Sequence, residues 1–200
     1  MADYLVPSGT GESEYSEKRS TFLGHLKPVK TEDEAREFIT LMKKTYHDAR
    51  HNCWCYIIHN GAERYSDDGE PQGTAGIPML EVFRKEGVSD FVCVVTRYFG
   101  GVLLGAGGLL RAYTKAAKSA LDAAGITEIV PQQSGEITCP YSLAERIKAE
   151  IIAFGGTVED ITYSDKVAVK FLMPLGRYDD FSARIFDLSA GTVKLPIYQA

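Results

Sequence analysis

A glycine-rich segment between Arg97 and Arg111 holds the most unusual residue pattern of the chain. It joins a β-branched run to a helical pattern, and its glycines are Gly100, Gly101, Gly105, Gly107 and Gly108. Glycine lets backbone N–H groups approach a ligand closely, and a helix N-terminus adds unpaired donors and a partial positive charge. The segment therefore predicts a cradle for an anion or a phosphate. Tight turns and close helix-to-sheet packing would also need these glycines, and the segment matches neither common nucleotide-binding fingerprint.

Three cations follow the glycines at helical spacing. Arg111, Lys115 and Lys118 are four and three residues apart, which places them on one side of the predicted helix. With Arg97 ahead of the glycines, this side forms a local basic stripe that indicates contacts with phosphates. A solvated helix face would show the same pattern.

An acidic loop is the second candidate for chemistry. Asp67, Asp68 and Glu70 precede Pro71, and close carboxylates can bind a hard cation or share a proton. An ordinary solvated turn has the same composition, and no complete coordination pattern surrounds these residues. We therefore predict no metal here, but we expect the loop to lie near the glycine segment, where it could orient an arginine or gate the site.

The pattern His51-Asn52-Cys53-Trp54-Cys55 places soft nitrogen and sulfur ligands on one strand face. A fourth zinc ligand is not evident, so a role in the core is favoured, and we predict neither a metal nor another cofactor. We also predict no catalytic residue, since the chain has no recognisable nucleophile elbow. Several aromatic residues could stack on bases, although their apolar spacing is typical of a core: Trp54, Tyr56, Tyr98, Phe99 and Tyr113.

Composition excludes several classes of protein. The 200 residues carry a net charge of -5, and 44% of them are hydrophobic, so the chain is neither globally basic nor disordered. No apolar stretch is long enough for a membrane span, and the N-terminus does not resemble a secretory signal. We therefore expect a cytoplasmic protein with reduced, mostly buried cysteines.

The first 130 residues predict alternating strands and helices. Residues 1–20 are polar and predict a mobile or edge segment, and a strand follows from Thr21. Thr31 and Glu34 form a capping box for a helix that extends to about residue 48. Residues 53–58 and 64–66 predict strands, a helix begins near residue 74, and residues 91–96 predict a strand at the centre of a sheet. A long helix with an apolar stripe that includes Leu110 then ends at Gly125.

The second half restarts after a polar linker at residues 130–135. Residues 136–139, 157–163, 167–173 and 192–197 predict strands. Ser142 and Glu145 predict a cap for one helix, and residues 177–188 predict another. The order βαββαβ is that of a ferredoxin-like motif, so we expect domains at residues 1–130 and 135–200.

Two long motifs resemble those of the IMPACT family, in its bacterial YigZ branch. One is Asp-Asp-Gly-Glu-Pro-x-Gly-Thr-Ala-Gly-x-Pro at residues 67–78. The other runs from Arg97-Tyr98-Phe99-Gly100-Gly101 to Arg111-Ala112-Tyr113. The resemblance covers nearly the whole chain. It implies an α+β fold, in which a domain similar to domain 2 of ribosomal protein S5 precedes a small ferredoxin-like domain.

The resemblance also implies a cytoplasmic, non-enzymatic protein of translation or stress control, in particular of translational initiation. RNA or a ribosomal component is the expected partner, and its phosphates would lie against residues 97–115. Two alternatives stay open. An enzyme or binding protein could hold a small phosphorylated ligand between the glycine segment and the acidic loop, and an interaction module could contact only a protein. The oligomeric state is open.

Overall fold

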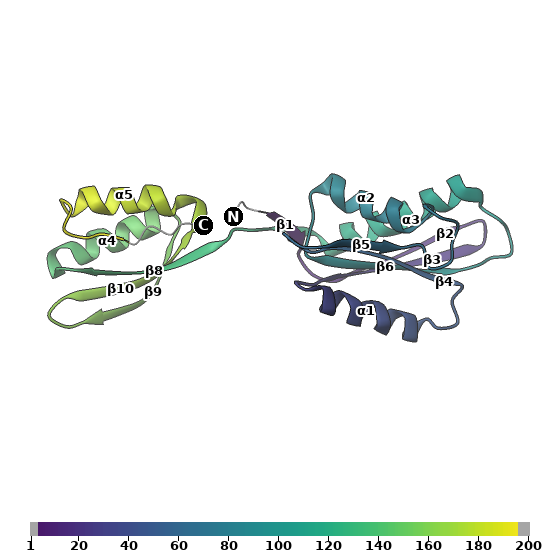
Figure 1. Ribbon diagram of the computed structural model, residues 1–200, viewed down its shortest axis with the longest axis horizontal. Helices are drawn as coiled ribbons and strands as arrows, with labels where there is room; N and C mark the ends of the chain where they lie inside the picture. Colours follow the sequence, from purple (N-terminus) through teal and green to yellow (C-terminus); the bar gives the residue numbers. More distant parts are fainter. Residues whose placement is uncertain (1–3, 196–200) are drawn as a thin grey trace. The chain divides into compact units, whose positions relative to one another are not determined.

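A five-stranded antiparallel sheet forms the centre of the first unit of the computed structural model, which describes residues 4–195 (Figure 1). This unit comprises Tyr4–Ile129, and a second compact unit begins at Val130. The strand order is β2-β3-β6-β4-β5. The strands are β2 (Gly11–Glu17), β3 (Ser20–Pro28), β4 (His51–Ile57), β5 (Glu63–Ser66) and β6 (Phe91–Tyr98). The predicted central strand is thus β6, which is buried from Phe91 to Arg97.

Helices cover both faces of this sheet. α1 (Glu32–Thr45) packs on one face, and α2 (Gly76–Glu86) and α3 (Gly105–Ala124) pack on the other (Figure 1). The capping box predicted at Thr31 and Glu34 is present. α1 ends at Thr45 rather than near residue 48.

The N-terminal residues form more structure than their polar composition indicates. β1 (Tyr4–Pro7) pairs with β7 (Ile126–Ile129), and β2 is an edge strand of the main sheet. A mobile segment is therefore the wrong description of residues 4–17, whereas an edge position is right for β2. Its alternating exposed residues explain the polar sequence, because an edge strand with one solvated face needs apolar residues only at alternate positions.

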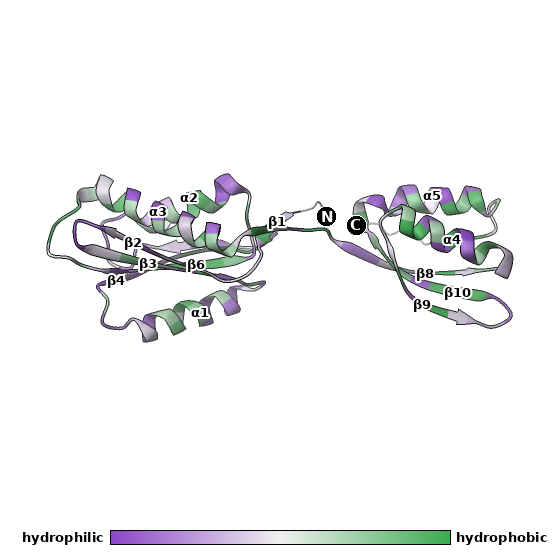
Figure 2. Cartoon of the chain, turned by 180° about the vertical axis from the view of Figure 1, so that it is seen from behind, coloured by the Kyte–Doolittle hydropathy of each residue, from purple (hydrophilic) through white to green (hydrophobic). Residues whose placement is uncertain are grey.

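The second unit packs two helices on a three-stranded sheet. Its elements are β8 (Gln132–Cys139), α4 (Tyr141–Ala153), β9 (Thr157–Tyr163), β10 (Val167–Pro174), a 3-10 turn (Leu175–Arg177) and α5 (Tyr178–Leu188). β10 lies between β8 and β9, and its inward side chains are fully buried under the helices. Figure 2 shows hydrophobic residues along this strand. The α+β class is thus confirmed for the chain.

Three details of this unit differ from the prediction. Residues 192–195 are irregular rather than a strand, and residues 196 and 197 of that predicted strand lie outside the described residues. No side chain caps α4, whose N-cap residue is Pro140, so the Ser142 and Glu145 cap is wrong. The supposed linker residues 132–135 belong to β8, because they pair with β10. No helix within residues 4–195 is long and apolar enough to span a bilayer.

Candidate anion-binding site

Strand register brings Arg97 beside two residues of neighbouring strands. Arg97 of β6 lies opposite His51 of β4 and Phe22 of β3. Directly opposed residues project to the same face of a sheet, and Phe22 belongs to the core under α2 and α3. The row His51-Arg97-Phe22 therefore faces the helices, which explains why an arginine at the end of an apolar strand is only 5% exposed.

Glu70 is the acidic partner of this buried arginine. Arg97 Nη1 donates to Glu70 Oε1 over 2.6 Å, and the Tyr113 hydroxyl of α3 donates to the same oxygen over 2.8 Å. Glu70 is itself only 8% exposed. Burial, together with neighbouring Cys53 and Glu70, raises the pKa of Tyr113, so its hydroxyl remains a donor. The contact joins the acidic loop, the central strand and α3 through one carboxylate.

The other two carboxylates of the acidic loop hold different parts of the backbone. Asp67 accepts hydrogen bonds from the amides of Gly73, Ala75 and Gly76 over 2.8 to 3.0 Å, and so caps the start of α2. Asp68 accepts from the Asn52 amide over 2.8 Å and from Lys43. The loop therefore orients an arginine, as predicted, but it does so through Glu70 alone.

His51 has a defined orientation at the same place. Its Nδ1 lies 2.8 Å from the Asp68 carbonyl oxygen, and because a carbonyl only accepts, Nδ1 carries the proton. Its Nε2 lies 3.9 Å from Glu70 Oε2. Cys53, two residues further along β4, is buried in the core, and burial raises the pKa of its thiol. His51 and Cys53 are therefore placed as separate groups, one at the site and one in the core.

A cavity of about 510 Å³ opens between the acidic loop and the start of α3. Its lining comes from both sequence motifs: Gly69, Glu70, Pro71, Arg97, Phe99, Leu103, Leu104, Gly105, Ala106 and Leu109, with Arg50 and His51 beside them. The Nε atom of Arg97 is buried and has no hydrogen-bond partner within the described residues. A buried donor without a partner is costly, and this one lies within the protein beside the cavity, to whose lining Arg97 contributes.

The first turn of α3 lies at the same cavity. α3 begins at Gly105, whose φ of 71° is unfavourable for other residues. No side chain caps this helix, and its first turn contains no acidic residue. The N–H groups and the positive end of a 20-residue helix are thus available to an anion.

The remaining glycines have different surroundings. Gly100 packs on the backbone of Arg19, which a Cβ atom would approach to 2.0 Å, and Gly101 has a φ of 83°. Gly107 and Gly108 lie in the first turn of α3 but outside the cavity lining. A Cβ atom on Gly107 would meet no backbone atom. Close packing and turns therefore account for Gly100 and Gly101, but not for Gly107.

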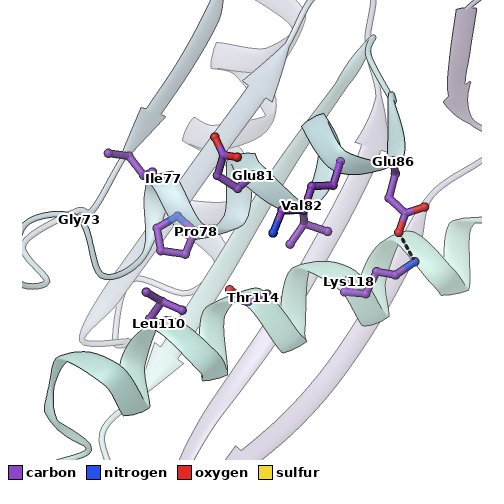
Figure 3. A pocket seen from close by; sticks show the side chains of 10 residues that line it. Gly73, Ile77, Pro78, Glu81, Val82, Glu86, Leu110, Thr114 and Lys118 are labelled. Atoms are coloured by element: carbon purple, nitrogen blue, oxygen red, sulfur yellow. Dashed lines mark ion pairs between the residues drawn. The ribbon is translucent and has the colours of Figure 1, made fainter.

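The predicted basic stripe is divided. Arg111 and Lys115 are exposed, and neither forms an ion pair with another residue of the described range. Lys118 instead pairs with Glu86 and Asp122 over 2.8 Å each, beside a second cavity of about 450 Å³ between α2 and α3 (Figure 3). Leu110, predicted on the apolar stripe, lines that cavity and is 45% exposed, so its assignment to the core is wrong.

Sequence patterns did not assign three residues to this site, although His51 and Phe99 were considered for other roles. Arg50 precedes β4, His51 is its first residue, and Phe99 follows β6. A β4–β6 pairing would have placed His51 against Arg97, but the sequence contains no signal for that register. The apolar spacing favours a core position for Phe99 over stacking on bases, but this side chain is 46% exposed.

Comparisons with known proteins cover both units. Residues 18–121 match the model of the Impact N-terminal domain, and residues 137–192 match a domain of unknown function, DUF1949. The chain is 38% identical to the IMPACT family member YvyE of Bacillus subtilis, over 96% of this chain and 89% of that protein. It is 31% identical to the IMPACT family member YigZ of Escherichia coli, over 98% of both proteins.

A solved structure, described as the crystal structure of a hypothetical protein, has the same fold. It covers 100% of this chain, with a TM-score of 0.66 and 30% sequence identity, and 98% of its own length is aligned. The acidic loop, the glycine segment and the cavity that they line all fall within the Impact N-terminal match. The two motifs, the two domain matches and the full-length relatives together show that the chain belongs to the IMPACT family.

Proposed function

We propose that this IMPACT family member is a non-enzymatic regulator of translation that contacts RNA or a ribosomal component through the start of α3. The observation that carries this proposal is the uncapped N-terminus of α3, with exposed Arg111 and Lys115 further along the same helix. Arg50 adds a cation to the lining of the adjoining cavity. Phosphates are bound by such a combination of helix N-terminus and unpaired cations.

The acidic net charge of -5 does not oppose a local contact of this kind. The acidic loop is neutralised by its own partners, since Glu70 is paired with Arg97 and Asp68 with Lys43. Asp67 is occupied by backbone amides. The surface at α3 is therefore more positive than the composition of the whole chain indicates.

The second unit is less suited to stacking on bases. The register of β10 places Lys170 opposite Glu136 and Asp160 on the face without helices. The other paired residues of this open face include no aromatic side chain: Gln132, Ser134, Thr138, Thr157, Thr162, Ala168, Leu172 and Pro174. Sheet-based RNA recognition uses aromatic side chains on such a face, so we assign the RNA contact to the first unit.

Equilibrium binding of the full chain to a fluorescent single-stranded RNA and to purified ribosomes tests the proposal. Binding that is lost after ribonuclease treatment, and is unaffected by deoxyribonuclease, is the expected result. No binding to either partner at low salt would contradict it.

A small phosphorylated ligand is the second candidate. The buried Arg97 with its unpartnered Nε favours it, because a cavity of about 510 Å³ has the size of a small-molecule site. An increase in melting temperature on addition of one phosphorylated metabolite, without affinity for RNA, would support this alternative.

A further inference from the structure

We propose that the cavity at the start of α3 holds one unstacked nucleotide of a single-stranded RNA. This inference rests on the proposed contact with RNA and specifies its form. The lining of the cavity combines two chemistries. It includes the α3 N-terminus and Arg97, and beside them the exposed apolar side chains of Phe99 and Leu103, so a phosphate and a base would each meet a suitable group.

The polar groups of the lining are suited to a phosphate. Gly105 and Ala106 bring the first turn of α3 to the cavity, and this turn has no capping side chain. Arg97 is an independent indication of a ligand, because it is about nineteen-twentieths buried and its Nε has no partner in the described part of the chain. Glu70 accepts a hydrogen bond from Nη1 of this guanidinium. An anion at the first turn of α3 would lie beside an arginine that Glu70 already holds in position.

The apolar side chains of the lining are suited to a base. Phe99 is 46% exposed and Leu103 is 83% exposed, although both lie in the turn that leads into α3. The Arg97 guanidinium lies 5.5 Å from the centre of the Phe99 ring, which supports this ring from within the fold. An aromatic ring with an exposed surface can stack on any base, and this recognition tolerates changes of RNA sequence.

Two features favour a nucleotide within a chain over a free metabolite. Arg111 and Lys115 lie on α3 outside the cavity lining, where only a ligand that continues beyond the cavity would reach them. Bases of a duplex are stacked and paired, so a base can enter the cavity only from a single strand or a loop. Single-stranded RNA therefore meets both the enclosed and the exposed parts of the site.

Fluorescence anisotropy with the full chain tests this inference. The probes are a fluorescein-labelled 12-nucleotide RNA of mixed sequence and the same RNA annealed to its complement, with a mixture of nucleoside monophosphates as competitor. Phe99→Ala is expected to weaken binding of the single strand by roughly 5- to 150-fold, the range for one lost base stack, while Phe99→Trp retains it. Tyr163→Ala, an exposed aromatic residue of the second unit, is the matched control and is expected to have no effect.

Leu103→Asp provides a second test that does not depend on the packing of Phe99 against Arg97. Leu103 is so exposed that the fold is expected to tolerate the change, whereas a carboxylate at the cavity would repel a phosphate. Ile152→Asp, at a 66% exposed position of the second unit, is its control. Loss of single-strand binding by Leu103→Asp but not by Ile152→Asp supports the inference.

The outcomes separate this inference from the proposed function. RNA binding that is unchanged by Phe99→Ala and Leu103→Asp, or that is equally strong for the duplex, would overturn the inference and leave the RNA contact standing. No RNA binding by the wild type would overturn both. Saturable binding of the monophosphates without affinity for the RNA would overturn both and favour the small-ligand alternative.

Discussion

Glu70→Gln tests whether the buried carboxylate holds the two motifs together. The Glu70 and Arg97 side chains are 3% and 6% exposed, so little solvent screens either charge. Loss of the negative charge would leave the Arg97 cation buried without compensation, which typically costs about 3 to 5 kcal/mol. A domain is stabilised by only about 5 to 15 kcal/mol in total. The variant is therefore expected to lose a large fraction of the free energy of unfolding of the first unit.

Urea unfolding followed by tryptophan fluorescence measures this loss. Trp54 is the only tryptophan of the chain, and it lies in β4 beside the central strand, so the signal reports on the first unit. Tyr113→Phe is the matched control, because it removes one hydrogen bond to Glu70 and keeps the ion pair. It should cost about 1.5 to 3 kcal/mol. A cost below about 1 kcal/mol for Glu70→Gln, or one smaller than that of Tyr113→Phe, would refute the assigned role of the pair.

Three further predictions concern other parts of the chain. Gly100→Ala should destabilise the first unit, because its Cβ atom would meet the backbone of the β2–β3 turn. Gly107→Ala should instead stabilise this unit by about 0.5 to 1 kcal/mol in the same urea assay, and equal effects of the two variants would contradict this. Burial lowers the pKa of His25, so as the pH falls this side chain is protonated in the unfolded state before it is protonated in the folded state. The free energy of unfolding should therefore decrease as the pH drops below about 6.5. A His25→Gln variant with the same pH profile as the wild type would contradict this. Limited proteolysis should cut first near Val130 and leave two stable fragments, and first cuts within residues 136–195 would disprove independent folding of the two units.

Local patterns predicted most elements of the fold. The capping box at Thr31 and the continuous apolar run of β6 each contain their signal within a few residues, so they were predicted from the sequence. β1 could not be predicted in this way, because it is stabilised by pairing with β7, more than 100 residues further along the chain. Leu110 is apolar and lies near the buried stripe of α3, but the packing of α2 leaves it at a cavity.

The candidate site shows the same division between local and long-range information. Both motifs were found in the sequence, and they were expected to lie close together. In the structure, residues of both motifs line one cavity. The sequence could not identify Glu70 as the partner of Arg97, since three carboxylates in one loop have the same chemistry and only their directions differ. It also grouped Lys118 with the free cations, because its pairing with Glu86 depends on how α2 packs against α3.

The salt dependence of RNA affinity tests the central claim most directly. Each phosphate contact releases counterions, so a plot of log affinity against log salt has a slope of about -0.7 per contact for a single strand. Arg111→Ala combined with Lys115→Ala should weaken binding and flatten this slope by roughly one to two units, with an almost unchanged melting temperature, because both side chains are exposed. Lys30→Ala combined with Lys44→Ala removes the same charge at the two ends of α1, on the other face of the sheet, and should leave the slope unchanged. Equal affinity and equal slope for the wild type and the Arg111/Lys115 double variant would contradict an RNA contact at α3.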